Sequence, residues 1–185
     1  MNHKCVPIDA ENSTHGKARR LFLDSAVAAG CTVLAPSGGT DPASEAVAYE
    51  ARLTTSPKLA RSATSGVPVF DLVLLGVGSD GHVGSLYPGR PEPLDVSSAL
   101  VLPVQKGSGP GSITLSLAVM NAARRVLLSA TGAGKAEAVR TCLEDKHAAG
   151  AFPAAMVACG AGNSWVVDEA AAARLAGAKG VAEMR

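Results

Sequence analysis

A chain of 185 residues is long enough to bury one sizeable hydrophobic core, and we expect residues 1–185 to form a single domain. Apolar residues make up 47% of the sequence and charged residues 18%, as in ordinary globular proteins. The 17 basic and 16 acidic residues nearly balance, so the basic excess of nucleic-acid-binding and membrane-binding proteins is missing. We therefore predict a small-molecule ligand, with neither nucleic acid nor membrane as a partner.

The cysteines and histidines indicate neither a disulfide framework nor a metal site. Cys5, Cys31, Cys142 and Cys159 form no Cys-x-x-Cys pair, so we expect buried, reduced thiols. The four histidines lack the i, i+4 spacing of helical zinc ligands, and we predict no metal and no cofactor. No apolar run approaches the roughly 20 residues that span a bilayer, and no stretch resembles a signal peptide. A cytosolic location is the default prediction, with an organelle left open.

The first predicted element is a helix that begins at Ser13 or Thr14 and ends at Ala29. Apolar residues recur within it at helical spacing, and Gly30 is a typical stop. A short apolar strand is predicted next, over Cys31–Ala35. The chain thus begins with an alternation of helix and strand.

A second helix is predicted over Ala43–Leu53, with Asp41 as its N-cap and Pro42 at its first position. After a polar connector, Val69–Leu75 is almost purely apolar and has the length of a parallel strand that is covered on both faces. The next stretch, Gly76–Pro93, contains five glycines and three prolines, so it is predicted to be an irregular loop. Loops of this length inside a domain tend to be functional.

The remaining predicted elements continue the alternation. They are a strand at 100–104 confined to a sheet edge by Pro103, a helix at 116–123, a strand at 126–130, a helix at 133–143, strands at 154–158 and 165–167, and a helix from the cap Asp168 to about 176. This order predicts an α/β fold with a mostly parallel sheet flanked by helices, in a Rossmann-like three-layer architecture.

The glycine-rich loop that follows the strand at 69–75 is the predicted functional site. Open parallel sheets bind ligands at the carboxyl ends of their strands, and this loop leaves such an end. Gly76-Val-Gly-Ser-Asp-Gly81 also matches the Gly-x-Gly-x-x-Gly nucleotide pattern, but the prolines that follow leave little room for the helix that a nucleotide site needs. Asp80 and His82 are the groups that can carry chemistry. On these residues alone, an Asx-turn at Asp80 and a turn-capping His82 are the more ordinary interpretation.

The segment Phe70–Gly89 resembles the signature shared by 6-phosphogluconolactonases and, more distantly, glucosamine-6-phosphate deaminases. Further blocks, similar to lactonase segments in the same order, bring the resemblance to nearly the whole chain: 6–9, 41–50, 113–123, 131–139 and 165–171. The resemblance implies hydrolysis of 6-phospho-D-glucono-1,5-lactone to 6-phosphogluconate in the oxidative pentose phosphate pathway. Deaminases usually carry a Glu just before the Pro-Gly that closes the loop. This chain has Tyr87 there, which favours lactone hydrolysis over an amino-sugar deaminase or isomerase.

The same chemistry gives the loop residues candidate roles. His82 is the candidate general base that activates water, and Asp80 is the candidate that orients the imidazole or the sugar hydroxyls. Backbone N–H groups around Gly78, Ser79 and Gly81 are candidates for binding the oxyanion of the tetrahedral intermediate.

The substrate phosphate needs a cation, and the resemblance implies Lys135, near the start of a predicted helix. Relatives usually have an acidic residue and an arginine where this chain has His3 and Lys4, and another arginine where it has Ser112. Lys4 would then make a point contact to phosphate in place of a bidentate one. We expect weaker phosphate binding as a result.

Relatives also carry an N-terminal unit with a Ser-Gly-Gly-Ser phosphate loop before the point where this sequence starts, so the chain is expected to be truncated relative to the family. Ser37–Thr40 imitates that loop but lies after the Val6-Pro7 block, and we interpret it as a coincidence with a small chance of anion binding. A missing unit would leave a sheet edge uncovered, where a protein partner or a second copy would bind. A catalytically weak or inactive homologue with a binding or structural role is therefore the alternative prediction.

Overall fold

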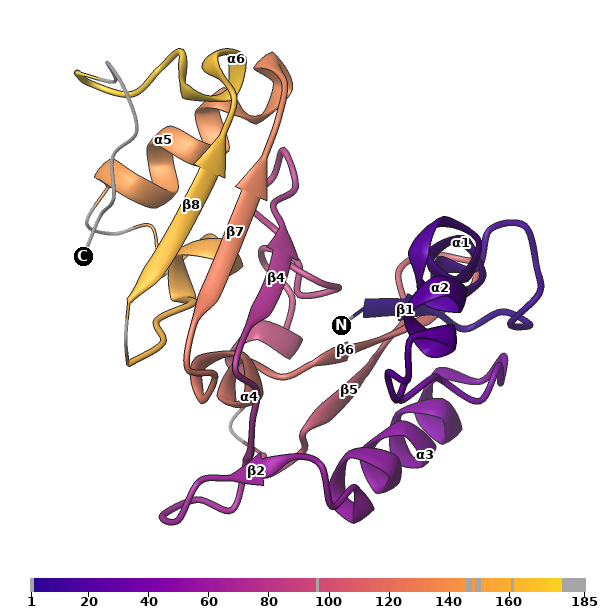
Figure 1. Ribbon diagram of the computed structural model, residues 1–185. Helices are drawn as coiled ribbons and strands as arrows, with labels where there is room; N and C mark the ends of the chain where they lie inside the picture. Colours follow the sequence, from indigo (N-terminus) through magenta and orange to yellow (C-terminus); the bar gives the residue numbers. More distant parts are fainter. Residues whose placement is uncertain (1, 96, 146–147, 149–150, 161, 178–185) are drawn as a thin grey trace. The chain divides into compact units, whose positions relative to one another are not determined.

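The computed structural model describes residues 2–95, 97–145, 148, 151–160 and 162–177 (Figure 1). The chain forms two compact units. The first comprises Met1–Lys58 and Ala99–Leu115, and the second comprises Leu59–Ser98 and Ser116–Arg185. Each unit has its own three-stranded sheet. The assignment of the chain to a single domain stays a prediction.

The sheet of the first unit is antiparallel, in the order β1-β6-β5. Its strands are β1 (Asn2–Lys4), β6 (Ser112–Leu115) and β5 (Val101–Val104). The position of β5 at the edge confirms the prediction from Pro103, which lacks a backbone N–H for a second neighbour. The sequence did not predict β1 or β6, because three or four residues are too few to show an alternating pattern.

The first predicted helix is confirmed as one continuous helical segment made of α1 (Thr14–Ala18), the π-helical turn Arg19–Leu23 and α2 (Asp24–Ala28). Its N-cap is Ser13, whose side chain accepts a hydrogen bond from the Gly16 N–H at 3.0 Å. The segment ends before Gly30, which has a φ of +90° that a side chain would disfavour.

Helix α3 (Pro42–Thr55) organises the first unit, and its predicted cap is confirmed. The Asp41 carboxylate accepts a hydrogen bond from the Ser44 N–H at 2.8 Å. The helix lies against β5 and β6 (Figure 1). Its Glu50 carboxylate accepts from the N–H groups of Leu100 and Val101, at 2.8 and 3.1 Å, and so fixes the start of β5.

The strand predicted over Cys31–Ala35 is wrong, because this segment is irregular. Side chains of α3 satisfy its carbonyl groups in place of a neighbouring strand. The Tyr49 hydroxyl donates to the Leu34 carbonyl at 3.2 Å, and the Arg52 guanidinium donates to the Ala35 carbonyl at 2.8 Å. The backbone therefore needs no ladder of strand hydrogen bonds.

The sheet of the second unit is parallel, in the order β4-β7-β8, and its strands point the same way in Figure 1. The strands are β4 (Val73–Gly76), β7 (Val126–Ala130) and β8 (Asn163–Val167). Val73 and Leu75 of β4 are buried on one face of this sheet. Strand β7 is followed in the chain by the 3-10 turn η3 (Ala133–Lys135) and helix α5 (Ala136–Glu144), and β8 is followed by helix α6 (Glu169–Ala172). These elements confirm the predicted α/β pattern.

Two predicted strands of this unit need correction. The apolar run 69–75 is divided, because β3 (Pro68–Val69) pairs with β2 (Ala60–Arg61) and only β4 joins β7. The segment predicted as a strand over 154–158 contains instead a 3-10 helix, Pro153–Met156. Proline fixes φ near its helical value at the first position of that turn, which explains the difference. The short helix predicted near 116–123 is confirmed as α4 (Leu117–Asn121).

Strand β4 is the edge strand of the described parallel sheet, and one sheet face carries exposed apolar side chains. Leu74 on β4 is 67% exposed and Val166 on β8 is 54% exposed. Parallel sheets are usually covered on both faces. A partner at this edge, as the sequence suggested, stays a prediction.

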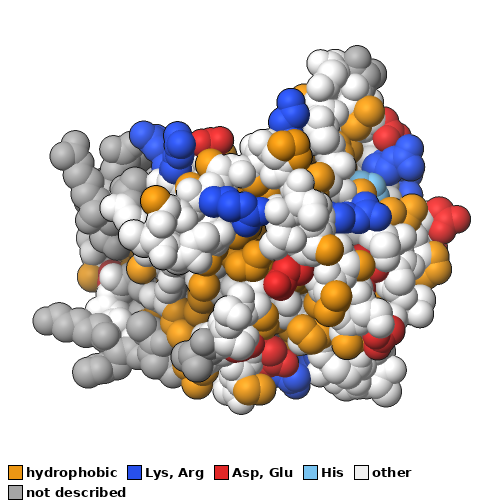
Figure 2. Space-filling model, turned by 90° about the horizontal axis from the view of Figure 1, so that it is seen from below, with side chains coloured by type: hydrophobic (Ala, Val, Ile, Leu, Met, Phe, Trp, Pro, Cys, Tyr) orange, Lys and Arg blue, Asp and Glu red, His pale blue; other side chains and the backbone are white. Residues whose placement is uncertain are grey.

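The surface shows mixed charges. On the face in Figure 2, basic and acidic side chains of the described residues are interspersed among apolar ones. Within the same described ranges, no helix is long and apolar enough to cross a membrane, and no three His, Cys, Asp or Glu side chains form a potential metal site. The cytosolic location stays a prediction.

The prediction that all four cysteines are buried is wrong for Cys31, which is exposed in the irregular segment after the first helix. Cys5 and Cys159 are buried, and Cys142 is partly buried. Burial raises the pKa of both the Cys5 and the Cys142 thiols to about 11, so both stay protonated near neutral pH.

His3 is a buried histidine without a hydrogen-bond partner in the described structure. It lies on β1 and is 1% exposed, and neither ring nitrogen is paired. Burial lowers the pKa of His3 below 6.5, the negative charge of Glu45 acts in the opposite direction, and the nearby His15 lowers the pKa further. His3 is therefore neutral in the folded protein near pH 7.

We expect His3 to make the protein less stable as the pH falls below about 6.5. The unfolded chain binds a proton at His3 more readily than the folded chain, so protonation favours unfolding in the window between the two pKa values. His3→Leu should reduce this acid sensitivity and keep or increase stability at pH 7.5, because it removes two unpaired buried nitrogens. Urea unfolding at pH 7.5 and 5.5 measures both effects. Equal pH dependence in the variant and the wild type would rule out this role.

Candidate active site

The loop after β4 lies at the carboxyl edge of the parallel sheet and is anchored by buried side chains. The Val77 N–H donates to the Ser129 carbonyl of β7 at 2.9 Å, which extends the sheet pairing by one residue. Val83 and Leu86 are 0% exposed and form an isolated antiparallel bridge, and Val83 also bridges to Val77. This buried framework holds the polar residues of the loop between its anchors.

Asp80 and His82 converge, as the catalytic prediction requires. Oδ1 of Asp80 lies 2.5 Å from Nδ1 of His82 and also accepts a hydrogen bond from the His82 N–H at 3.2 Å. The second bond is the Asx-turn expected from an ordinary loop, so the turn and the side-chain pair coexist. In such a pair the carboxylate holds a proton on Nδ1 and leaves Nε2 as the basic nitrogen.

The Asp80 carboxylate is stabilised in its ionised form. Partial burial by itself raises the pKa of Asp80, but hydrogen bonds from the side chain and backbone of His82 outweigh burial and lower the pKa below 3.8. The carboxylate is therefore charged at neutral pH.

Gly78 provides the space that the histidine ring occupies. A Cβ atom at this position would overlap the ring of His82 and would lie 2.6 Å from Oδ1 of Asp80. Gly81 has a different constraint, because its φ is +79° and a Cβ would overlap the ring of Phe152. Both positions therefore require glycine, because the His82 ring lies close to the backbone of Gly78 and the Phe152 ring lies close to the backbone of Gly81.

The backbone amides of the loop are not equally available for an oxyanion. The Gly78 N–H donates to the His82 carbonyl at 2.8 Å, and the Gly81 N–H donates to the Gly78 carbonyl at 3.0 Å. The Ser79 N–H has no hydrogen-bond partner within the part of the chain that the structure describes. Of the three amides predicted to bind the oxyanion, those of Gly78 and Gly81 are therefore already paired, and that of Ser79 is available as the N–H donor.

Lys135 lies at the same sheet edge as the loop, because it follows the carboxyl end of β7 and β4 and β7 are parallel neighbours. It occupies the N-cap position of α5, where a helix dipole attracts anions. Asp168 braces the preceding turn by accepting from the Gly132 N–H at 2.9 and 3.0 Å. Among the described residues, the Lys135 side chain forms no ion pair, so its charge is available to a ligand.

Lys4 belongs to the other unit. It is exposed on β1, and Ser112 of β6 is its direct cross-strand partner. The two positions where relatives usually have an arginine therefore face each other across one strand pair. This pairing could not be seen in the sequence, where 107 residues lie between the two positions.

The Ser37–Thr40 loop does not offer a phosphate site. The buried carboxylate of Glu45 accepts hydrogen bonds from the Ser37 N–H at 2.7 Å, from the Gly39 N–H at 2.8 Å and from the Ser37 hydroxyl. Glu45 is 1% exposed and supplies the negative charge that these amides bind. The loop is thus filled from inside the protein, which agrees with the interpretation of its sequence as a coincidence.

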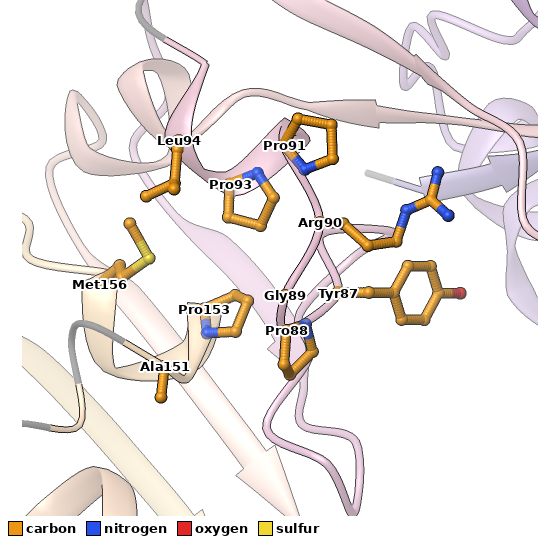
Figure 3. A pocket seen from close by; sticks show the side chains of 10 residues that line it. All are labelled: Tyr87, Pro88, Gly89, Arg90, Pro91, Pro93, Leu94, Ala151, Pro153 and Met156. Carbon is orange, nitrogen blue, oxygen red and sulfur yellow. The ribbon is translucent and has the colours of Figure 1, made fainter.

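Tyr87 contacts the candidate base, a contact that the sequence did not reveal. Its ring centroid lies 4.8 Å from that of His82, with the planes at 44°. Tyr87 also lines a cavity of about 300 Å³ whose walls are mostly apolar (Figure 3). The side chains of Tyr87 and Arg90 extend in the same direction, and Arg90 pairs with Glu92 at 2.9 Å. The other residues that line the cavity are Pro88, Gly89, Pro91, Pro93, Leu94, Ala151, Pro153 and Met156.

The fold and the loop define the class of protein: an α/β protein with a histidine–aspartate pair at the carboxyl edge of a parallel sheet. The family model for glucosamine-6-phosphate isomerases/6-phosphogluconolactonase matches residues 1–166. The chain belongs to this family, as the resemblance predicted.

Named relatives agree with this assignment. The 6-phosphogluconolactonase of Rattus norvegicus is 39% identical over 176 residues, which cover 92% of this chain and 65% of the relative. The Homo sapiens protein of the same name is 37% identical with the same coverage. The solved structure of 6-phosphogluconolactonase from Trypanosoma brucei is 30% identical, with a TM-score of 0.76 over 95% of this chain and 72% of that one. The predicted α/β fold class is thereby confirmed. The chain spans 65% of the length of the mammalian relatives.

Proposed function

We propose that the chain hydrolyses 6-phospho-D-glucono-1,5-lactone to 6-phosphogluconate, a step of the oxidative pentose phosphate pathway. The observation that carries the proposal is the contact of 2.5 Å between Asp80 Oδ1 and His82 Nδ1 in the loop at the carboxyl edge of the sheet. The names of the rat and human relatives support it. Because the chain spans 65% of those relatives, the activity of the whole proteins remains a proposal for this chain.

The first step is attack of water on the lactone carbonyl carbon. Nε2 of His82 removes a proton from water as the new C–O bond forms, and the carbonyl π electrons move to the carbonyl oxygen. The Asp80 carboxylate at Nδ1 stabilises the resulting imidazolium. The His82 side chain is 32% exposed, which leaves part of the ring accessible to water and substrate.

The second step is collapse of the tetrahedral intermediate. The oxyanion accepts a hydrogen bond from the Ser79 N–H, an amide of the loop that has no partner in the described structure. The ring C–O bond then breaks, and the departing ring oxygen takes the proton from the imidazolium. The products are the carboxylic acid, which ionises, and a free hydroxyl group, so His82 returns to its initial state. Only protein groups and water take part.

Lys135 of the second unit is proposed to bind the substrate phosphate, and Lys4 of the first unit stays a separate prediction for phosphate binding. The ammonium group of Lys135 and the N-terminus of α5 place two sources of positive potential at one point. Lys4 is exposed and carries the charge at a position where relatives usually have an arginine. A lysine makes a point contact where an arginine makes a bidentate one, so we expect weaker phosphate binding than in those relatives.

The proposal predicts lactone hydrolysis above the spontaneous rate. Freshly generated 6-phosphoglucono-1,5-lactone is mixed with the protein, and 6-phosphogluconate is followed by its coupled oxidation. Because general-base catalysis contributes about 100- to 10,000-fold, the rate should rise well above the no-protein blank and in proportion to protein concentration. A folded sample with the rate of the blank would contradict the proposal.

The contribution of the phosphate is measured in the same assay with glucono-1,5-lactone, which has no phosphate. Wild-type protein should prefer the phosphorylated lactone, and Lys135→Gln should lose most of that preference through a higher KM. Loss of one charge-assisted hydrogen bond corresponds to about 1.5–3 kcal/mol, or roughly 10- to 150-fold in kcat/KM. An unchanged preference in the variant would remove Lys135 from the phosphate site and leave the hydrolysis proposal intact.

A further inference from the structure

The contact between Tyr87 and His82 is set by the backbone of the loop. Val83 and Leu86 form an antiparallel bridge and are fully buried. His82 precedes Val83 and Tyr87 follows Leu86, so the two rings stand opposite each other across the extension of that bridge. Side chains at opposite positions of an antiparallel pair lie close together. The ring contact at 4.8 Å is therefore a consequence of a buried anchor, not of two mobile surface side chains.

The hydrogen bond that the Asp80 carboxylate accepts from Nδ1 does not by itself fix the histidine ring. The last side-chain torsion of histidine joins a tetrahedral and a planar carbon, and its energy profile is broad. A single contact at Nδ1 therefore permits the ring to rock about that bond. The backbone of Gly78 lies so close to one side of the ring that a Cβ there would overlap it. The tilted ring of Tyr87 limits the movement of the imidazole further. These three contacts restrict the direction in which Nε2 points.

We propose that Tyr87 is a positioning residue that holds the imidazole of His82 in the orientation needed to deprotonate water. This inference rests on the proposed hydrolytic function. The aromatic ring, and not the hydroxyl group, carries the role, because the contact is between the two rings. Tyr87 acts through His82 and does not itself exchange a proton with the substrate.

Tyr87 also lines the cavity, so its replacement needs a control for a change in the cavity wall. Leu94 lines the same cavity and is 67% exposed, and it has no aromatic ring that could stack on His82. Leu94→Ala is therefore the matched control for a change in the wall. Tyr87→Phe keeps the ring and removes the hydroxyl, and Tyr87→Leu removes the ring and keeps an apolar side chain.

The experiment measures kcat and KM for lactone hydrolysis and the ¹⁵N NMR signals of the His82 imidazole in the wild type and these variants. Tyr87→Phe should stay within about two-fold of the wild type in kcat. Tyr87→Leu should lose about ten-fold or more in kcat with KM nearly unchanged, since small misplacements of a catalytic group cost rate more than binding. Its imidazole signals should also shift away from the form protonated at Nδ1. Leu94→Ala should change neither kcat nor the signals.

Two outcomes would overturn the inference. The first is a Tyr87→Leu variant with wild-type kcat and wild-type imidazole signals, and the second is an equal loss in Tyr87→Phe and Tyr87→Leu, which would assign the role to the hydroxyl. Tyr87→Met replaces Tyr87→Leu if the latter does not fold. The NMR signals also separate this inference from the proposed function: a wild type without lactonase activity contradicts the function, while the response of the imidazole to loss of the ring still decides the positioning role.

Discussion

Replacing His82 with alanine should lower kcat for lactone hydrolysis by about 100- to 10,000-fold, the usual contribution of a general base. The imidazole is the group that the Asp80 carboxylate holds at 2.5 Å, and its removal leaves water without a base. KM should change little, because the phosphate is assigned to Lys135. Steady-state kinetics with the coupled assay of 6-phosphogluconate formation measures both constants.

The fold should survive this substitution. The His82 side chain is 32% exposed and its loss leaves the buried anchors Val83 and Leu86 in place, so unfolding free energy should change by about 1 kcal/mol or less. His15→Ala is the matched control, since it removes a histidine of the first unit that has no assigned role in the reaction. A His82→Ala protein that hydrolyses the lactone at the wild-type rate would refute the mechanism.

The Gly81→Ala substitution should destabilise the protein by about 2–6 kcal/mol. Two costs add: a residue with a side chain at a φ of +79° costs about 1–3 kcal/mol, and overpacking against the ring of Phe152 costs a similar amount. The shift would also disturb the hydrogen bond from the Ala154 N–H to the Gly81 carbonyl, at 2.9 Å. Urea unfolding of the wild type and the variant measures the difference.

Gly66 provides a matched control for the backbone part of this cost. Its φ is +69°, and a Cβ there would have no atom within 4 Å. Gly66→Ala should therefore be destabilised by backbone strain alone, about 1–3 kcal/mol. The double variant Gly81→Ala with Phe152→Ala should be less destabilised than the sum of the two single changes, because the overlap disappears. Strict additivity would show that the Phe152 overlap is not the cause.

The elements that the sequence predicted well are those decided by neighbouring residues. Asp41 and Pro42 begin α3 because a carboxylate reaches the amide three positions on, and Gly30 ends the first helix because it adopts a positive φ. The edge position of Pro103 follows from its missing N–H. In each case the decisive interaction lies within a few residues, so its signal is local.

The wrong predictions involve partners that are distant in the sequence. The segment 31–35 has the composition of a strand, but side chains from α3 satisfy its carbonyls. The segment 154–158 is apolar, but Pro153 begins a 3-10 turn whose amide at Ala154 reaches back to Gly81. Propensity is a weak signal when long-range contacts satisfy the backbone in another way.

The sequence by itself determined the family, the α/β order and the position of the loop that carries Asp80 and His82, because these depend on a continuous motif after an apolar strand. Only the tertiary structure decided which groups of that loop meet. The buried bridge between Val83 and Leu86 brings Tyr87 onto the imidazole, a geometry that spacing along the chain does not specify. Tertiary structure also decided that the Ser37–Thr40 loop binds the carboxylate of Glu45 and not an external anion, which the sequence had left open. A buried carboxylate must find hydrogen-bond donors within the protein, and the amides of this loop supply them.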